Sequence, residues 1–192
     1  RRQRQMCIRD SVVTGDVNPS GKLVDTYAAT LEDYPSTENF HKSVYYVDYN
    51  EDIYVGYRYF ETIPGAAEKV NYPFGFGLSY TSFEQSITDL KDDGTNITVT
   101  VEVKNTGSTA GKDAVEVYMT PPYTNGGIEK AEVNLIQYAK TGMIEPGASE
   151  MVSVSFAKED MASYDYSGIK AEGGAYVLEA GTVSYTHLRA HE

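Results

Sequence analysis

Cysteine and histidine are nearly absent from this chain of 192 residues, which contains one cysteine and three histidines. Cys7 lies close to the N-terminus, so the rest of the chain offers neither disulfides nor thiolate chemistry. His41 is the one histidine outside the last few residues, and it cannot supply a metal site or a Ser/His/Asp triad alone. The lone Gly75-x-Gly77 lacks the third glycine of a dinucleotide fingerprint, so we predict no dinucleotide-binding site.

Long apolar runs and an excess of basic residues are also missing. No run approaches the roughly 18 apolar residues that a membrane-crossing helix requires, so we expect no membrane partner. The net charge is −12, and an acidic surface repels the phosphates of nucleic acids. We therefore expect no nucleic-acid partner, whereas a neutral ligand such as a sugar is not repelled by the negative charge.

Both ends of the chain differ in composition from its middle. Residues 1–10 contain four arginines, whereas Arg58 is the one arginine between residues 11 and 188. Residues 1–11 and 183–192 resemble translated sequencing-adapter read-through, and we interpret both as non-native tails outside the fold. The alternative interpretation of the first tail is a native basic arm, which would indicate a nucleic-acid or membrane surface.

Residues 12–83 form an irregular region that is broken by glycine and proline and has no amphipathic helix of about three turns. Tyrosine is dense in it, with six tyrosines from Tyr45 to Tyr59. The tyrosine side chain combines an apolar ring with a polar tip, which suits half-buried surfaces. Because the region has too little periodic apolar sequence for a core of its own, we expect it to pack on a larger body.

Residues 84–182 show the two-residue period of half-buried β-strands. Three runs alternate apolar and polar residues, at 97–103, 115–119 and 152–156. Further candidate strands are 84–90, 133–140 and 176–180. Turn residues such as Asn105-Thr106-Gly107 separate these runs. About six or seven short strands predict a mainly β fold class, an immunoglobulin-like or fibronectin type III-like β-sandwich preceded by the irregular region.

Three motifs follow one another in the irregular region. They are N-P-S-G-K-L at 18–23, Y-N-E-D-I-Y-V-G-Y-R-Y at 49–59, and Y-P-F-G-F-G-L-S-Y-T-S-F at 72–83. Together they resemble the end of the catalytic region of family 3 glycoside hydrolases, the β-glucosidase and β-xylosidase group. Asp52 stands where glycine is usual in the family's second segment, whereas the third segment matches almost residue for residue.

The predicted sandwich also resembles the fibronectin type III-like domain that ends many members of this family. The matching segments are 101–107, 110–112, 115–118, 138–141, 145–147, 161–165 and 176–181. The resemblance implies a C-terminal fragment, with residues 12–83 as the remnant of an α/β sandwich domain and residues 84–182 as the fibronectin type III-like domain. We expect the final strand to be cut short by the second tail, which would leave its partner's edge partly open.

By this resemblance, the whole enzyme is a retaining hydrolase of β-glucosides or related β-linked sugars. It would need no cofactor and would bind a β-linked oligosaccharide or glucoside through its catalytic domains. Retaining glycosidases use two carboxylates about 5 Å apart, and the family places both upstream of the matched segments. We therefore expect no catalytic residue in this chain, which would be inactive by itself.

The carboxylates that the chain does contain have simpler interpretations. Glu51 lies in a matched motif, where it either approaches a sugar pocket or pairs with a backbone amide or with Arg58. The acidic pairs at 92–93 and 159–160 are expected to be solvated turn or cap residues.

The motif at 72–83 suits neither a helix nor a strand, because proline fixes one backbone angle and two glycines allow close backbone approach. We interpret it as a tightly packed connection through which the sandwich braces the preceding domain. The residues assigned to this joint are Tyr57, Arg58, Pro73, Phe74, Gly75, Phe76, Gly77, Leu78 and Tyr80. The alternative function is a free-standing adhesion or carbohydrate-binding module, and a sugar-binding relative that has lost catalysis is a third.

Overall fold

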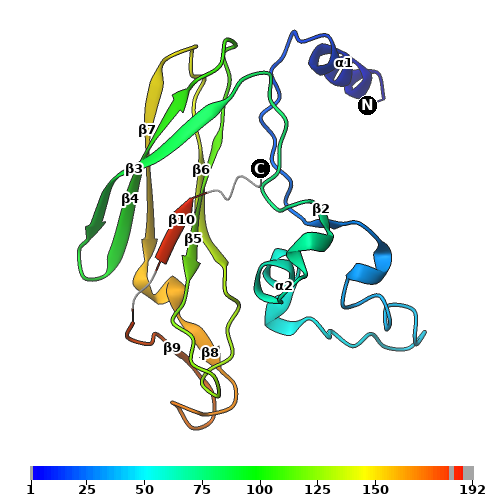
Figure 1. Cartoon of the computed structure of the whole chain (residues 1–192), viewed down its shortest axis with the longest axis vertical. Helices are drawn as coiled ribbons and strands as arrows, with labels where there is room; N and C mark the ends of the chain where they lie inside the picture. Colours follow the sequence, from blue (N-terminus) through cyan, green and yellow to red (C-terminus); the bar gives the residue numbers. More distant parts are fainter. Residues whose placement is uncertain (1, 182–183, 188–192) are drawn as a thin grey trace.

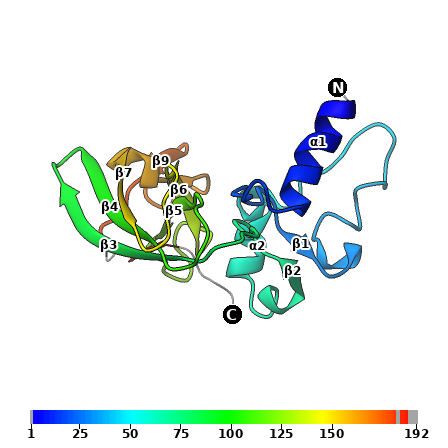
Figure 2. The ribbon, with the colours of Figure 1, turned by 90° about the horizontal axis from the view of Figure 1, so that it is seen from above.

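The computed structural model describes residues 2–181 and 184–187 and shows a β-sandwich with an irregular N-terminal part beside it (Figure 1). The two parts also lie side by side in the second view (Figure 2). The N-terminal part contains α1 (Arg2–Val13), β1 (Tyr27–Ala28), η1 (Leu31–Asp33), η2 (Asp52–Tyr54), α2 (Tyr57–Thr62), η3 (Ala67–Lys69) and β2 (Val70–Tyr72). The sandwich contains β3 (Phe83–Asp92), β4 (Asn96–Asn105), β5 (Ala114–Thr120), β6 (Asn134–Lys140), β7 (Ser149–Ala157), η4 (Lys158–Met161), β8 (Ser163–Asp165), β9 (Ala175–Val177) and β10 (Ser184–His187).

The core of the sandwich lies between two antiparallel sheets, with strand orders β3-β4-β7 and β10-β5-β6. In β4, Val99, Val101 and Val103 are buried, because alternate side chains of a strand point to the same face. Val101 pairs with Val152 of β7, so both strands present their apolar face to the core. The core cluster is Ile97, Val99, Val101, Val103, Val115, Val117, Met119, Ile144, Val152, Val154, Phe156 and Met161. The two-sheet sandwich predicted from the two-residue period is confirmed.

Strand β5 is buried on both faces, which differs from the one-sided alternation of its sequence. Its apolar positions face the core, but Glu116 and Tyr118 on the opposite face are buried as well. The N-terminal part covers them, with the ring of Tyr57 centred 6.1 Å from that of Tyr118. The alternation in a strand predicts which face meets the core. It does not predict whether another segment covers the polar face.

The C-terminal end of the sandwich also differs from the expected strands. The run 176–180 contributes only to the short β9, which pairs with β8. The side of β5 away from β6 is taken by β10, with Ser184 opposite Thr120 and His187 opposite Val117. Residues 184–187 therefore pair with the sandwich, whereas they were expected to lie outside the fold. The other residues of 183–192 lie outside the described ones.

The N-terminal part has almost no core of its own, as its sequence predicted. Within the described residues 12–83, the buried apolar side chains are Phe60 and Ala66. Phe60 packs edge-on against Tyr34, with ring centres 5.7 Å apart. Most of residues 1–11, the first tail, lie in helix α1. The end of this helix contacts the motif at 72–83, because the Tyr80 hydroxyl donates a hydrogen bond to the carbonyl of Val12 (2.7 Å).

Asp165 organises the loop that follows β8. Its buried carboxylate accepts hydrogen bonds from the backbone N–H groups of Ile169 (3.0 Å), Lys170 (2.6 Å) and Ala171 (3.1 Å). The hydrogen bond from Lys170 has the largest effect in lowering the pKa of Asp165, because it favours the charged carboxylate.

Asp165→Asn is expected to destabilise the chain near neutral pH, because a neutral amide accepts these hydrogen bonds more weakly than a carboxylate. A lowered folded-state pKa means that Asp165 adds stability above its unfolded pKa of about 3.9 and loses it as pH falls through the folded value. The Tm, measured by circular dichroism from about pH 7 to about pH 2, should fall more steeply with decreasing pH for the wild type than for Asp165→Asn. Asp48→Asn, at an exposed aspartate, controls for the lost charge; equal slopes for the wild type and Asp165→Asn would contradict this prediction.

Candidate functional site

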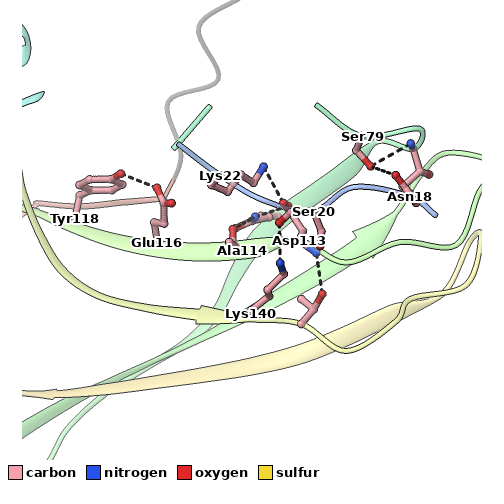
Figure 3. Close-up of polar contacts among 12 residues, drawn as sticks. Asn18, Ser20, Lys22, Ser79, Asp113, Ala114, Glu116, Tyr118 and Lys140 are labelled. Carbon is pink, nitrogen blue, oxygen red and sulfur yellow. Dashed lines mark hydrogen bonds and ion pairs between the residues drawn. The ribbon is translucent and has the colours of Figure 1, made fainter. Parts of the chain in front are cut away.

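The candidate functional site is the joint, the surface where residues 18–23, 54–62 and 72–83 meet the sandwich. These segments overlap the three sequence motifs. A cavity of 830 Å³ opens between the two parts, with walls from both sides of the joint. Figure 3 shows polar side chains at the joint, with residues from both parts pointing toward one another.

Close backbone contacts hold the first and third segments together. The N–H of Leu23 donates to the carbonyl of Phe76 (2.8 Å), and the N–H of Gly75 donates to the carbonyl of Leu23 (2.9 Å). Gly75 has a φ of +79°, and a Cβ there would lie 2.6 Å from Oε2 of Glu116. The left-handed backbone therefore favours glycine at position 75, and a Cβ there would have to displace the Glu116 carboxylate.

An ion pair crosses the joint at the edge of β5 (Figure 3). Nζ of Lys22 lies 3.0 Å from Oδ1 of Asp113, whose side chain is only 7% exposed. The other carboxylate oxygen of Asp113 accepts a hydrogen bond from Nε2 of Gln85 (2.8 Å). Nζ of Lys140 donates to the carbonyl of Ser20 (2.8 Å). A buried carboxylate is costly unless it is paired, so Lys22 holds the first motif against the sandwich.

Asn18 links three pieces of chain through one amide group. Its Nδ2 donates to the carbonyl of Ala110 (3.0 Å), in the turn before β5. Its Oδ1 accepts from the hydroxyl of Ser79 (2.9 Å) and from the N–H of Tyr80 (2.9 Å). The asparagine of the first motif thus fixes the third motif and the sandwich relative to each other.

Aromatic rings form the other half of the joint. The Tyr57 ring is centred 4.7 Å from that of Phe74, and its hydroxyl accepts a hydrogen bond from the N–H of Leu135 (2.7 Å). Arg58 places its guanidinium carbon 5.5 Å from the centre of the same ring, a cation–π distance. Tyr57 therefore contacts both the third motif and the backbone of β6.

Tyr118 and Glu116 form a buried hydrogen-bonded pair beneath this aromatic layer. The hydroxyl of Tyr118 donates to Oε2 of Glu116 at 2.6 Å (Figure 3). Burial, and then the hydrogen bond to Glu116, raise the pKa of Tyr118 above its ordinary value. The phenol therefore stays protonated and keeps donating, which gives a hydrogen-bond partner to a carboxylate that the N-terminal part covers.

The residues assigned to the joint from the sequence lie in these segments, but not all of them pack there. Tyr57, Phe74 and Gly75 make the contacts described above, and Pro73, Gly75, Phe76 and Gly77 line the cavity. Leu78 is largely exposed, although it also borders the cavity. No joint role was predicted from the sequence for Lys22, Asp113 or Glu116, although each belongs to, or lies next to, a matched segment.

The acidic residues outside the joint mostly serve turns. Asp92 accepts from the N–H of Gly94 (2.8 Å), Asp93 from the N–H of Thr95 (2.8 Å), and Asp160 from the N–H of Ala157 (3.0 Å). This confirms the turn and cap interpretation of these three residues.

Asp52 has a φ of +45°, which accounts for the glycine usual at that position. For Glu51, the described residues show no side-chain hydrogen bond or ion pair, so the expected pairing with Arg58 or a backbone amide is not seen. In residues 2–181 and 184–187, no group of three or more His, Cys, Asp and Glu side chains could hold a metal ion. No helix among these residues is long and apolar enough to cross a membrane.

The sandwich belongs to the fibronectin type III-like class, because residues 113–184 match the model of the fibronectin type III-like domain. The chain is 50% identical over 188 residues to Beta-glucosidase A of Butyrivibrio fibrisolvens, covering 88% of this chain and 22% of that protein. It corresponds to the C-terminal region of β-glucosidases of glycoside hydrolase family 3, as the motifs predicted.

Solved structures agree with this assignment. A β-glucosidase from Paenibacillus barengoltzii is 43% identical with a TM-score of 0.85, covering 92% of this chain and 19% of that one. β-Glucosidase 3B from Thermotoga neapolitana, solved in complex with glucose, is 38% identical with a TM-score of 0.80, covering 92% of this chain and 24% of that one. This chain therefore spans about a fifth of the length of these relatives.

Proposed function

We propose that this chain is the C-terminal part of a retaining glycoside hydrolase that acts on β-glucosides or related β-linked sugars. The observation that carries the proposal is the 50% identity to Beta-glucosidase A of Butyrivibrio fibrisolvens over nearly the whole chain. The glucose bound in the Thermotoga neapolitana enzyme supports a β-glucoside substrate. The catalytic carboxylates belong to the preceding region of the whole enzyme, and the chain by itself is inactive.

In this proposal the sandwich braces the catalytic region through the joint. The contacts of Lys22 with Asp113, of Asn18 with Ala110 and of Tyr57 with Leu135 all cross from the motif segments to the sandwich. They fix the N-terminal part, which has almost no core of its own, at one position on β5 and β6. These residues position the enzyme's parts and do not touch substrate.

A chimaera tests this function directly. It joins the remainder of Beta-glucosidase A to the present chain, which replaces the homologous region of that enzyme. We expect the chimaera to hydrolyse a chromogenic β-glucoside with kcat/KM within about tenfold of Beta-glucosidase A, and to release the β-anomer first, as a retaining enzyme does. The purified 192-residue chain should show no turnover.

Two results would contradict the proposal. Turnover by the 192-residue chain alone would place catalysis within it. A folded but inactive chimaera, together with binding of β-glucan by the chain alone, would favour the carbohydrate-binding module.

A further inference from the structure

The loop that joins β5 to β6 is fixed by a buried lysine. The side chain of Lys130 is only 3% exposed, and its Nζ donates a hydrogen bond to the carbonyl of Pro122 (2.7 Å). This bond closes the loop, because it joins a residue near the start of the loop to one near its end. Tyr123 and Glu129, which adjoin these two residues, are therefore held at fixed positions on the two arms of the loop.

Ion pairs tie this loop to the loop between β8 and β9. The carboxylate of Glu179 pairs with Nζ of Lys130, and it lies 3.6 Å from Nζ of Lys170. The buried carboxylate of Asp165 holds Lys170 through its backbone N–H. Tyr166, the residue after Asp165, therefore stands on the same fixed frame. Figure 1 shows β8, β9 and the loop between β5 and β6 at the same end of the sandwich.

Tyr54 of the N-terminal part meets this end of the sandwich. Its hydroxyl donates a hydrogen bond to Oε1 of Glu129. Burial, and then this hydrogen bond, raise the pKa of Tyr54 above its ordinary value, and the nearby Tyr123 and Tyr166 raise it further to a smaller extent. Three phenol hydroxyls and one carboxylate therefore gather where η2 and the two loops meet. We call Tyr54, Tyr123, Tyr166 and Glu129 the tyrosine cluster.

The part of the tyrosine cluster that the sandwich contributes is open to solvent. Tyr123 is 55% exposed and Tyr166 is 70% exposed, and Glu129 is exposed as well. Within the described residues, the hydroxyls of these two tyrosines make no hydrogen bond. Their backbone is nevertheless fixed by buried charged groups, as described above. A ligand that binds here would therefore meet groups whose ordering cost has largely been met in the free protein.

We propose that the tyrosine cluster is a binding site for a β-linked gluco-oligosaccharide. The rings of Tyr123 and Tyr166 stack on the apolar C–H faces of the sugar rings. The carboxylate of Glu129 accepts hydrogen bonds from neighbouring sugar hydroxyls, and charge-assisted bonds of this kind are strong. A sugar carries no charge, so the net charge of −12 does not repel it. The choice of β-linked glucose rests on the proposed function, whereas the site itself rests on the contacts described above.

An alkylammonium ion is the other ligand that aromatic rings and a carboxylate recognise together. Tight recognition of such a cation requires ring faces that shield it from water, whereas Tyr123 and Tyr166 are largely open to solvent. A quaternary ammonium ion also offers no donor or acceptor to the phenol hydroxyls, whereas each sugar hydroxyl both donates and accepts. The composition and exposure of the tyrosine cluster therefore favour a sugar.

The first test is calorimetric titration of the purified 192-residue chain with cellotetraose. We expect saturable binding with a Kd on the order of 1 mM or tighter. Maltotetraose has the same sugar units but α-linkages, which curve the chain away from a second ring, so it should bind at least about tenfold more weakly. Equal affinities for the two oligosaccharides, or no binding of cellotetraose at about ten times that Kd, would overturn the proposal. Tighter binding of choline than of cellotetraose would also overturn it.

Variants of the exposed cluster residues locate the binding. Tyr123→Ala, Tyr166→Ala and Glu129→Gln should each weaken cellotetraose binding about tenfold, because each removes a stacking ring or the charge of the acceptor. The Tm should stay near that of the wild type, since these side chains are exposed. Tyr138→Ala and Glu145→Gln make the same changes at exposed residues outside the cluster, and both should bind cellotetraose as the wild type does. Equal affinities for the cluster variants and these controls would refute the site.

The chimaera separates this inference from the proposed function. Binding is measured on the 192-residue chain alone, so it does not depend on turnover. An active chimaera, together with a 192-residue chain that does not bind cellotetraose, would leave the function intact and overturn the site. Binding that the cluster variants weaken would support the site even beside an inactive chimaera, which would count against the proposed function.

Discussion

Asn105→Asp is expected to lower the free energy of unfolding of the chain by about 3 kcal/mol, the cost of disrupting a fully buried hydrogen-bond network. Asn105 ends β4 and is completely buried. Its Nδ2 donates to the carbonyls of Thr109 (2.8 Å) and Ile144 (2.9 Å). Its Oδ1 accepts from the hydroxyl of Thr81 (2.6 Å) and the N–H of Gly107 (3.1 Å). An aspartate has the same shape but no donor, so one oxygen would face two carbonyl oxygens.

Urea unfolding followed by circular dichroism measures this loss. Asn125→Asp makes the same chemical change at an exposed turn residue and should stay within about 0.5 kcal/mol of the wild type. The deficit of Asn105→Asp should shrink at low pH, because a protonated carboxyl group regains one donor. Coincident unfolding curves for the wild type and Asn105→Asp would refute the role assigned to this amide.

Gly77→Ala is expected to open the joint. A Cβ at position 77 would lie 2.5 Å from the carbonyl oxygen of Gly21 and 2.8 Å from Cδ of Lys22. The lysine side chain can move, but the carbonyl is backbone that the hydrogen bonds between Leu23 and the third motif hold in place. Relieving such a contact costs about 1–3 kcal/mol, which is large for a part that is held mainly by the joint.

Limited proteolysis measures the opening, since cleavage within residues 12–83 should become several-fold faster while the sandwich stays resistant. Gly21→Ala is the matched control, because a Cβ there meets no atom within 4 Å and its φ is not in the left-handed region. It should leave the cleavage rate near that of the wild type. The interpretation of the joint as a close backbone contact fails if both alanine variants are cleaved at equal rates.

The sandwich could be predicted from the sequence because its signal is local. Val99, Val101 and Val103 alternate with polar residues, and that alternation by itself places them on one face of a strand. The end of the sandwich could not be predicted in the same way. Residues 184–187 carry no strong period, and they pair with β5 because its open side offers unpaired backbone groups.

The sequence indicated which segment forms the joint, but it did not indicate which side chains contact one another there. The proline and glycines of the motif at 72–83 predicted a compact connection, and Gly75 has a left-handed φ and lies against the side chain of Glu116. Leu78 was assigned by its position within the motif, yet it is largely exposed. A motif shows which segment matters, whereas the contacts of each side chain depend on the surface opposite.

The sequence by itself determined the β-sandwich and the glycosidase family, because periodic apolar residues and contiguous motifs are properties of neighbouring residues. Only the tertiary structure decided that Lys22 pairs with Asp113, that Gly77 touches Gly21, and that Glu116 is buried. Those partners are far apart along the chain or covered by another segment, and their contacts arise only once the two parts are packed together. A contact of that kind leaves no period in the sequence from which it could be predicted.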